Sequence, residues 1–191
     1  MRRARFDLAA ALLALLQGCA IFENAEPTII TSGEAPTLVP DVPFVFSAEE
    51  VVDAMLALAK VGASDLVYDL GCGDGRIVVA AAARFGARGV GIDIDPQPLF
   101  YARANARRAG VAERVVFIRG NFFETDLRPA TVVTLYLSPE VNRRLLPKLR
   151  SELAPGTRIV SHKFDMGEAW PPEKSVRVGD SILHLWTVPP R

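Results

Sequence analysis

Residues 68–77 read YDLGCGDGRI, a glycine-rich turn that directly follows the short apolar run from Leu66 to Leu70. Glycine has no Cβ and tolerates positive φ, so a turn of this kind lets the backbone approach a ligand closely. The alanine-rich segment from Arg76 to Phe85 has the pattern of a helix. The stretch therefore predicts a strand, a turn that meets a ligand, and a helix.

The chain beyond this turn continues to alternate strand-like and helix-like segments. We expect strands at 89–94, 115–119, 130–135 and 158–161, and helices at 97–109 and 140–153, the last bent or interrupted by Pro147. This alternation predicts an α/β fold, a mostly parallel sheet flanked by helices on both faces. The segments 176–178 and 182–188 flank Gly179-Asp180, which predicts an antiparallel hairpin at the end of the sheet.

The first 46 residues have a different character from the rest. Residues 1–19 combine three early arginines with an apolar stretch about half as long as a bilayer-spanning helix, which is typical of a signal peptide. Leu16-Gln17-Gly18-Cys19 resembles a bacterial lipobox, in which the cysteine is lipidated. A mis-called start codon or a retained amphipathic leader is the alternative. Residues 20–46 carry four prolines and predict a linker.

The predicted domain covers residues 47–191. It begins with Ser47-Ala48-Glu49-Glu50, a capping-box pattern in which Ser47 and Glu50 would satisfy each other's backbone amides at the start of a helix. The chain has 191 residues, half of them hydrophobic, which suits one domain with one substantial core. Lys plus Arg and Asp plus Glu both number 22, so no global positive field favours nucleic acid.

The ligand of the turn can be inferred from its neighbours. In an open parallel sheet the ligand lies at the carboxyl ends of the strands, so Asp93, about twenty residues after the turn, is placed to accept ribose hydroxyls. A dinucleotide site would need a glycine where Arg76 stands. Asp69 would repel pyrophosphate and suits a ligand with an ammonium group. These features disfavour a nicotinamide-dependent reductase.

The segment from Asp69 to Gly75 resembles the first motif of the class I S-adenosylmethionine-dependent methyltransferases. The resemblance implies a Rossmann-like class I methyltransferase fold and S-adenosylmethionine as the cofactor. It implies cofactor binding by Asp69, Gly71, Gly73, Gly75, Asp93 and Asn121. Asn121 stands where many class I enzymes have an acid that meets the adenine amino group, and its carbonyl can accept the same hydrogen bond. No metal is implied.

Longer segments carry a second resemblance. VPFVFSAEEVVDAML, DLGCGDGRIVVAAA, VVTLYLSPEVN and PGTRIVSHKFDMG are similar to small bacterial relatives of the ATP synthase c-subunit lysine methyltransferase family. The similarity covers residues 42–167. It implies N-methylation of a lysine on a protein, and an anchored enzyme could reach a membrane-embedded substrate.

Candidate acceptor-site residues follow the fourth and fifth strands. Methyl transfer from a sulfonium is an in-line displacement that requires alignment and exclusion of water. A lysine must arrive uncharged, which a carboxylate or an aromatic hydroxyl can assist. Tyr136 and Asp165 are the preferred candidates for the catalytic site, and His162 is the third. The alternatives are that Tyr136 is packing, Asp165 a turn residue and His162 a satisfied strand-end histidine.

Two other functions remain open at this point. A small-molecule methyltransferase would need an acceptor pocket that closes over its substrate. The stretch after His162 is too short for a full helix, which favours an open acceptor side and a macromolecule. An exported, non-catalytic domain is favoured if Cys19 is processed and lipidated. The enzyme would be membrane-associated through the leader, or cytoplasmic if the start is mis-called.

Overall fold

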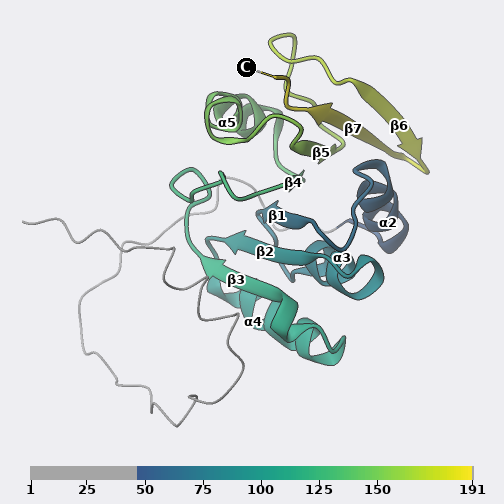
Figure 1. Cartoon of the computed structure of the whole chain (residues 1–191), viewed down its shortest axis with the longest axis vertical. Helices are drawn as coiled ribbons and strands as arrows, with labels where there is room; N and C mark the ends of the chain where they lie inside the picture. The colour runs from purple at the N-terminus through teal and green to yellow at the C-terminus, as the bar shows by residue number, and fades with distance from the viewer. Residues whose placement is uncertain (1–46, 191) are drawn as a thin grey trace, which may run out of the picture. The chain divides into compact units, whose positions relative to one another are not determined.

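The computed structural model describes residues 47–190, which belong to the unit Thr37–Arg191 of the chain (Figure 1). The predicted leader, residues 1–19 with Cys19, and the predicted linker, residues 20–46, lie outside the described residues. Within the described part, no helix is both long and apolar enough to cross a membrane.

One seven-stranded sheet forms the centre of the domain, with strand order β3-β2-β1-β4-β5-β7-β6. The strands are β1 (Leu66–Leu70), β2 (Arg88–Asp93), β3 (Val115–Arg119), β4 (Val132–Leu135), β5 (Arg158–His162), β6 (Lys174–Val178) and β7 (Ser181–Thr187). The strands β1 to β5 pair in parallel, whereas β7 runs antiparallel to both β5 and β6. The predicted fold class, including the antiparallel C-terminal hairpin, is confirmed.

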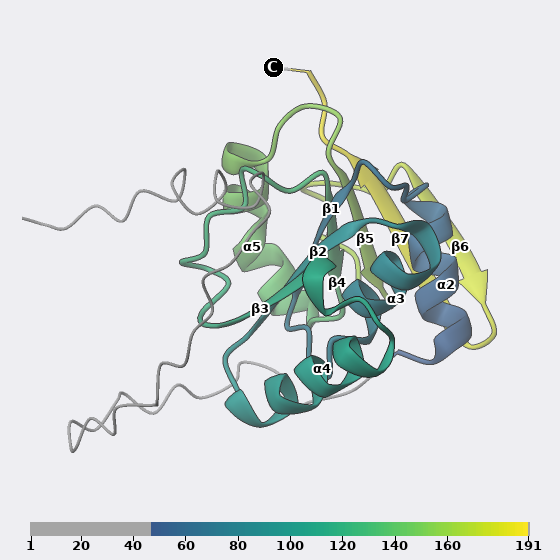
Figure 2. The same cartoon turned by 60° about the horizontal axis from the view of Figure 1, so that its bottom comes forward.

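Helices cover the sheet unequally on its two faces. The helices α2 (Glu49–Leu58), α3 (Arg76–Phe85) and α4 (Pro96–Arg108) pack on one face, and α5 (Pro139–Glu152) packs on the other. Figures 1 and 2 show these layers from two directions. Pro147 lies inside α5, which continues past it to Glu152, so the helix is not interrupted there, and the alternative of a bend at Pro147 stays a prediction.

The two faces have separate apolar cores because side chains alternate along each strand. Val67 of β1 and Val160 of β5 belong to the core under α2 and α3, whereas Tyr68 and Ile159 belong to the core under α5. No helix follows β3 or β5 within the described residues. The loops 120–131 and 163–173 replace helices there, which confirms that the stretch after His162 is too short for one.

The capping-box prediction at the start of α2 is wrong. The residue that caps α2 is Ala48, and no side chain accepts a hydrogen bond from the first turn. The Ser47 hydroxyl pairs instead with His162 Nδ1 at 2.8 Å. The physical reason is that a buried imidazole nitrogen without a partner costs free energy, whereas water can solvate the amides of an exposed helix end.

Candidate functional site

The glycine turn follows β1 and lies against the carboxyl end of β2, as the sequence predicted. The amides of Gly71 and Cys72 donate to the Ile92 carbonyl at 2.8 and 3.0 Å, and the Gly73 amide donates to Asp93 Oδ2 at 2.8 Å. The φ values of Gly71, Gly73 and Gly75 are 78°, 53° and 73°, and residues with a Cβ rarely adopt such values. The turn therefore needs its glycines for backbone conformation, and the Gly73 amide ties the Asp93 carboxylate to it.

Gly75 has a second, packing role. A Cβ at this position would lie 2.5 Å from Phe117 Cε1 on β3 and 2.9 Å from Ala102 Cβ on α4. The missing Cβ therefore lets the start of α3 approach the neighbouring strand and helix. Gly71 is less crowded, since its Cβ would lie 3.1 Å from Leu137 Cδ2.

Asp69 is a buried acid at the end of β1. The pKa of its carboxyl group is raised to about 7, chiefly by burial and to a smaller extent by the negative charges of Asp93 and Asp74, against the lowering effect of a 2.7 Å hydrogen bond from the Thr134 hydroxyl. A carboxyl group in such surroundings gains most from a neighbouring positive charge, because the charge favours its ionised form. The buried Asp69 carboxyl group beside this turn therefore fits a ligand with an ammonium group.

Asn121 begins the loop that replaces a helix after β3. Its Oδ1 accepts a hydrogen bond from the Phe123 amide at 3.0 Å, and its backbone carbonyl accepts from the Thr125 amide and hydroxyl. The side-chain oxygen keeps a second lone pair, so adenine contact by Asn121 stays a prediction.

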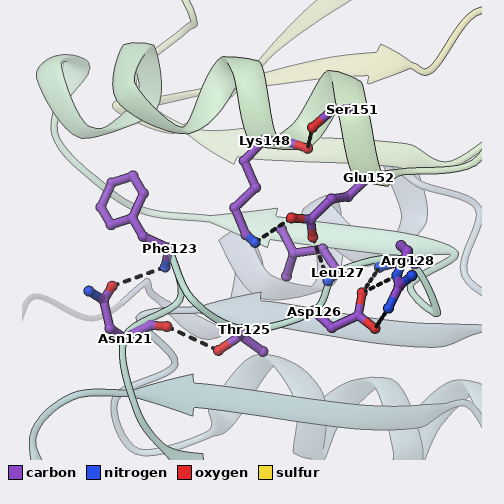
Figure 3. A network of polar contacts seen from close by, with 9 residues as sticks. All are labelled: Asn121, Phe123, Thr125, Asp126, Leu127, Arg128, Lys148, Ser151 and Glu152. Carbon is purple, nitrogen blue, oxygen red and sulfur yellow. Dashed lines mark hydrogen bonds and ion pairs between the residues drawn. The ribbon is translucent and has the colours of Figure 1, made fainter. Parts of the chain in front are cut away.

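Helix α5 holds the far part of this loop in place (Figure 3). Glu152 Oε2 accepts a hydrogen bond from the Leu127 amide at 2.9 Å, and Glu152 Oε1 pairs with Lys148 Nζ at 2.6 Å. The Leu127 side chain is fully buried. The loop is thus tied by a charged acceptor and by apolar packing rather than by helical hydrogen bonds.

Tyr136 and His162 are brought together at the ends of β4 and β5. Their ring centroids lie 4.0 Å apart with an interplanar angle of 32°. His162 is buried, and Ser47 and Ser181 hydroxyls lie 2.8 Å from its Nδ1 and Nε2. Burial, with a smaller contribution from Lys163, lowers the pKa of His162 to about 4. The imidazole is therefore neutral at physiological pH, and both of its nitrogens are occupied.

Asp165 lies on an exposed part of the loop after β5. Its Oδ1 accepts a hydrogen bond from the Gly167 amide at 2.9 Å, which is the turn role named as the alternative. The fully buried Asn142 of α5 donates to the carbonyls of Phe164 and Asp165 at 3.0 and 3.3 Å and so fixes the loop backbone. The part of Asp165 in acceptor binding stays a prediction.

Several residues of this region were not nominated from the sequence. They are Ser47, Arg76, Thr134, Asn142 and Ser181. Thr134 carried a usable signal, since it is the one polar residue in the apolar stretch from Val132 to Leu135. Cys72 is buried, and burial raises the pKa of its thiol well above the ordinary value, which makes the thiol a poor nucleophile. Within residues 47–190 no group of three metal-ligating side chains is present.

Comparison with known families gives this geometry a context. The ANTKMT methyltransferase domain family matches residues 69–174, which is more than half of the chain. The chain belongs to the ANTKMT methyltransferase domain family. The predicted resemblance to class I S-adenosylmethionine-dependent methyltransferases, and the enzyme class that it implied, are confirmed.

Three curated relatives of this methyltransferase domain are lysine methyltransferases. A protein-lysine N-methyltransferase of Saccharolobus islandicus is 48% identical over 147 residues, which cover 76% of this chain and 91% of the relative. The adenine nucleotide translocase lysine N-methyltransferase of Mus musculus is 35% identical over 76% of this chain and 62% of its own length. The ATP synthase c-subunit lysine N-methyltransferase of Caenorhabditis elegans is 30% identical over 78% of each chain.

A similar solved structure is the RNA methyltransferase from Salinibacter ruber in complex with S-adenosyl-L-homocysteine. It is 52% identical to this methyltransferase, with a TM-score of 0.75, over 77% of this chain and 95% of that one. S-Adenosylhomocysteine is what remains of S-adenosylmethionine after methyl transfer, so the predicted cofactor class is confirmed.

Proposed function

We propose that this chain is an S-adenosylmethionine-dependent protein-lysine N-methyltransferase. The observation that carries the proposal is the 48% identity to the protein-lysine N-methyltransferase of Saccharolobus islandicus across 91% of that protein. At this identity and coverage the two chains share the whole catalytic domain rather than one motif.

The cofactor site is formed by the first and second strands. Asp69 would hold the ammonium group of the cofactor, and Gly71, Gly73 and Gly75 would shape the turn that receives its amino-acid tail. Asp93, held by the Gly73 amide at 2.8 Å, accepts the ribose hydroxyls. The second lone pair of Asn121 Oδ1 would accept a hydrogen bond from the adenine amino group. Bound S-adenosylmethionine supplies a methyl group on a positively charged sulfur that leaves as a neutral thioether.

The protein's task at the acceptor side is to orient an uncharged lysine. The partly exposed ring of Tyr136 forms a wall for the acceptor, and its hydroxyl orients the incoming amine. His162 supports this ring rather than removing a proton, because both of its nitrogens are already hydrogen-bonded. We propose that the exposed carboxylate of Asp165 draws the cationic side chain in before it loses its proton.

The absence of a helix in the loop 163–173 fits a protein as substrate. An acceptor side without a covering helix suits a side chain presented on a large partner better than a small molecule that must be enclosed.

Methylation of RNA is the second candidate, favoured by the description of the Salinibacter ruber relative as an RNA methyltransferase. RNA-binding proteins gain most of their affinity from positively charged surfaces. This chain has equal numbers of acidic and basic residues. The charge balance therefore favours a protein substrate.

The test is to incubate the full chain with S-adenosylmethionine labelled in its methyl group and with extracts of a strain from which the gene has been deleted. Label should enter a protein and map to lysine after complete digestion. Asp93→Ala should abolish labelling, whereas Glu113→Ala, at an exposed position before β3 and at the opposite edge of the sheet, should leave it unchanged. Label in RNA would support the second candidate, and label only in small molecules would support the small-molecule alternative.

We also propose that residues 1–19 act as an export or lipoprotein-like leader, with Cys19 as the anchor and a membrane-embedded protein as substrate. The support comes from the sequence pattern of the leader. Mass spectrometry of the purified N-terminus decides between the alternatives. A lipidated Cys19 supports anchoring, an unprocessed N-terminus at Met1 supports an enzyme with a retained leader, and an unlipidated N-terminus downstream of Cys19 supports a cytoplasmic enzyme with a mis-called start. A lipidated protein without cofactor binding would favour the non-catalytic alternative.

A further inference from the structure

Ser47 is a buried residue that contacts both sides of the proposed active site. Its side-chain oxygen lies 2.8 Å from His162 Nδ1, and its backbone carbonyl accepts a hydrogen bond from Arg76 NH1 at 2.9 Å. His162 belongs to the acceptor side, whereas Arg76 directly follows the glycine turn. One residue just before α2 therefore bridges two regions that are 29 and 115 positions away in the sequence.

The Arg76 contact leads directly into the glycine turn. The guanidinium of Arg76 donates to Asp74 through Nε at 2.9 Å and through NH2 at 2.7 Å, a bidentate arrangement. Both side chains are partly buried, with 32% and 21% of their side-chain surfaces exposed. Bidentate pairs of this kind restrict orientation more than a single hydrogen bond does. The position of the Ser47 backbone is thereby tied to the turn that receives the cofactor.

The His162 contact leads to the acceptor wall. The opposite ring nitrogen, Nε2, lies 2.8 Å from the Ser181 hydroxyl at the start of β7. The imidazole ring is thus held at both nitrogens, and its flat face lies against Tyr136 at 4.0 Å between centroids. Movement of Ser47 would free one end of this ring and change the support of Tyr136.

We propose that Ser47 is a positioning residue that sets the acceptor wall relative to the cofactor turn. This inference rests on the proposed function, since it takes the turn as the place of the cofactor and Tyr136 as the wall for the acceptor. In-line transfer depends steeply on the distance and angle between the two reactants. A series of hydrogen bonds runs from Asp74 through Arg76 and Ser47 to His162. It fixes the position of the acceptor wall relative to the cofactor turn, where no helix of the described residues covers the acceptor side.

The protein contains two histidines, which provide a built-in control. His184 Nδ1 on β7 lies 2.8 Å from the Ser175 hydroxyl of β6, so its serine partner differs from that of His162. The imidazole signals of the full chain are recorded by NMR before and after addition of S-adenosylhomocysteine. We expect the ligand to shift the His162 signals and to leave the His184 signals in place. Ser47→Ala should remove most of the ligand-induced shift at His162, whereas Ser175→Ala should leave it unchanged.

Kinetics provide the second readout. Ser47→Ala should lower kcat for methylation of the protein substrate roughly three- to tenfold, which is the rate effect expected from the loss of one hydrogen bond. The Kd of S-adenosylhomocysteine should change less than about twofold. Ser47→Thr keeps a hydroxyl and should restore most of kcat, which distinguishes positioning from damage to the fold. Ser175→Ala should match the unmodified chain.

Three results would overturn the inference. They are a ligand-induced shift at His162 that survives Ser47→Ala, equal kinetic effects of Ser47→Ala and Ser175→Ala, and no rescue by threonine in a variant that melts normally. The NMR readout uses no methyl acceptor, so it is independent of whether the acceptor is lysine. Absence of any binding heat for S-adenosylhomocysteine would instead overturn the proposed function together with this inference.

Discussion

Replacement of Asp69 by asparagine should stabilise the cofactor-free protein and weaken cofactor binding at the same time. The carboxyl group is buried, and its pKa is raised from 3.8 to about 7. Between these two pH values the folded protein keeps the proton that the unfolded chain loses. The folded state therefore binds more protons in this range, and its stability falls as the pH rises toward 7.

The magnitude follows from the size of the pKa shift. A shift of roughly three units, at about 1.4 kcal/mol for each unit, corresponds to about 4 kcal/mol of stability lost above pH 7. Asparagine has nearly the same shape, carries no charge and can still accept the hydrogen bond of the Thr134 hydroxyl. Asp69→Asn should therefore match the unmodified chain near pH 4 and exceed its stability by about 3 to 4 kcal/mol at pH 8.

Chemical denaturation without cofactor between pH 4 and pH 8 measures this difference. In thermal melts at pH 8 the variant should unfold about 10 °C higher, at roughly 2 to 4 °C for each kcal/mol. Titration calorimetry with S-adenosylmethionine should show affinity lower by about 10- to 100-fold, since a hydrogen bond to a charged group is lost. A stability difference that does not change with pH, or unchanged affinity, would refute the reasoning.

Three further outcomes follow from the geometry. Gly75→Ala should destabilise the fold by about 2 to 4 kcal/mol, from crowding and left-handed strain, whereas Gly110→Ala, which has a similar φ but open space, should cost about 1 kcal/mol in urea titrations. Glu152→Ala should lower the free energy of unfolding by about 1 to 2 kcal/mol because the Leu127 amide in the loop loses its acceptor. The control is Arg128→Gln at an exposed position, which should leave the melting temperature unchanged. NMR titration of His162 should give a midpoint near pH 4, and a midpoint near 6.5 would contradict the buried, neutral ring. The free energy of unfolding should fall as the pH drops from 6.5 toward 4, because the unfolded chain binds a proton at this histidine before the folded protein does.

The main elements of the fold were predictable because their signals are local. Strands β1 and β3 and helix α3 have the predicted bounds, and the antiparallel pairing of β7 follows a two-residue turn. The glycine turn was equally predictable, since Gly71, Gly73 and Gly75 all have positive φ. Asp69 and Asp93 were predictable as neighbours because parallel strands end at one edge of the sheet.

The acceptor side was predictable only in part. Tyr136 and His162 were nominated separately from the ends of two strands, and the structure brings their rings into contact. Their relationship was hidden from the sequence because it depends on the pairing of β4 with β5 and on two serines from distant segments. The turn role of Asp165 was predicted as an alternative, but the hydrogen bond that the Asn142 side chain of α5 donates to the Asp165 carbonyl was not.

The sequence by itself determined the succession of strands and helices along the chain, the glycine turn and the family to which the domain belongs. Tertiary structure alone decided what Ser47 does. Its sequence context is that of a helix cap, yet its hydroxyl pairs with a histidine 115 positions away. A local sequence pattern indicates only which hydrogen-bond partners lie nearby along the chain. Folding brought a buried histidine close to Ser47, and leaving that histidine unpaired would cost more free energy than leaving the amides of a helix end to water.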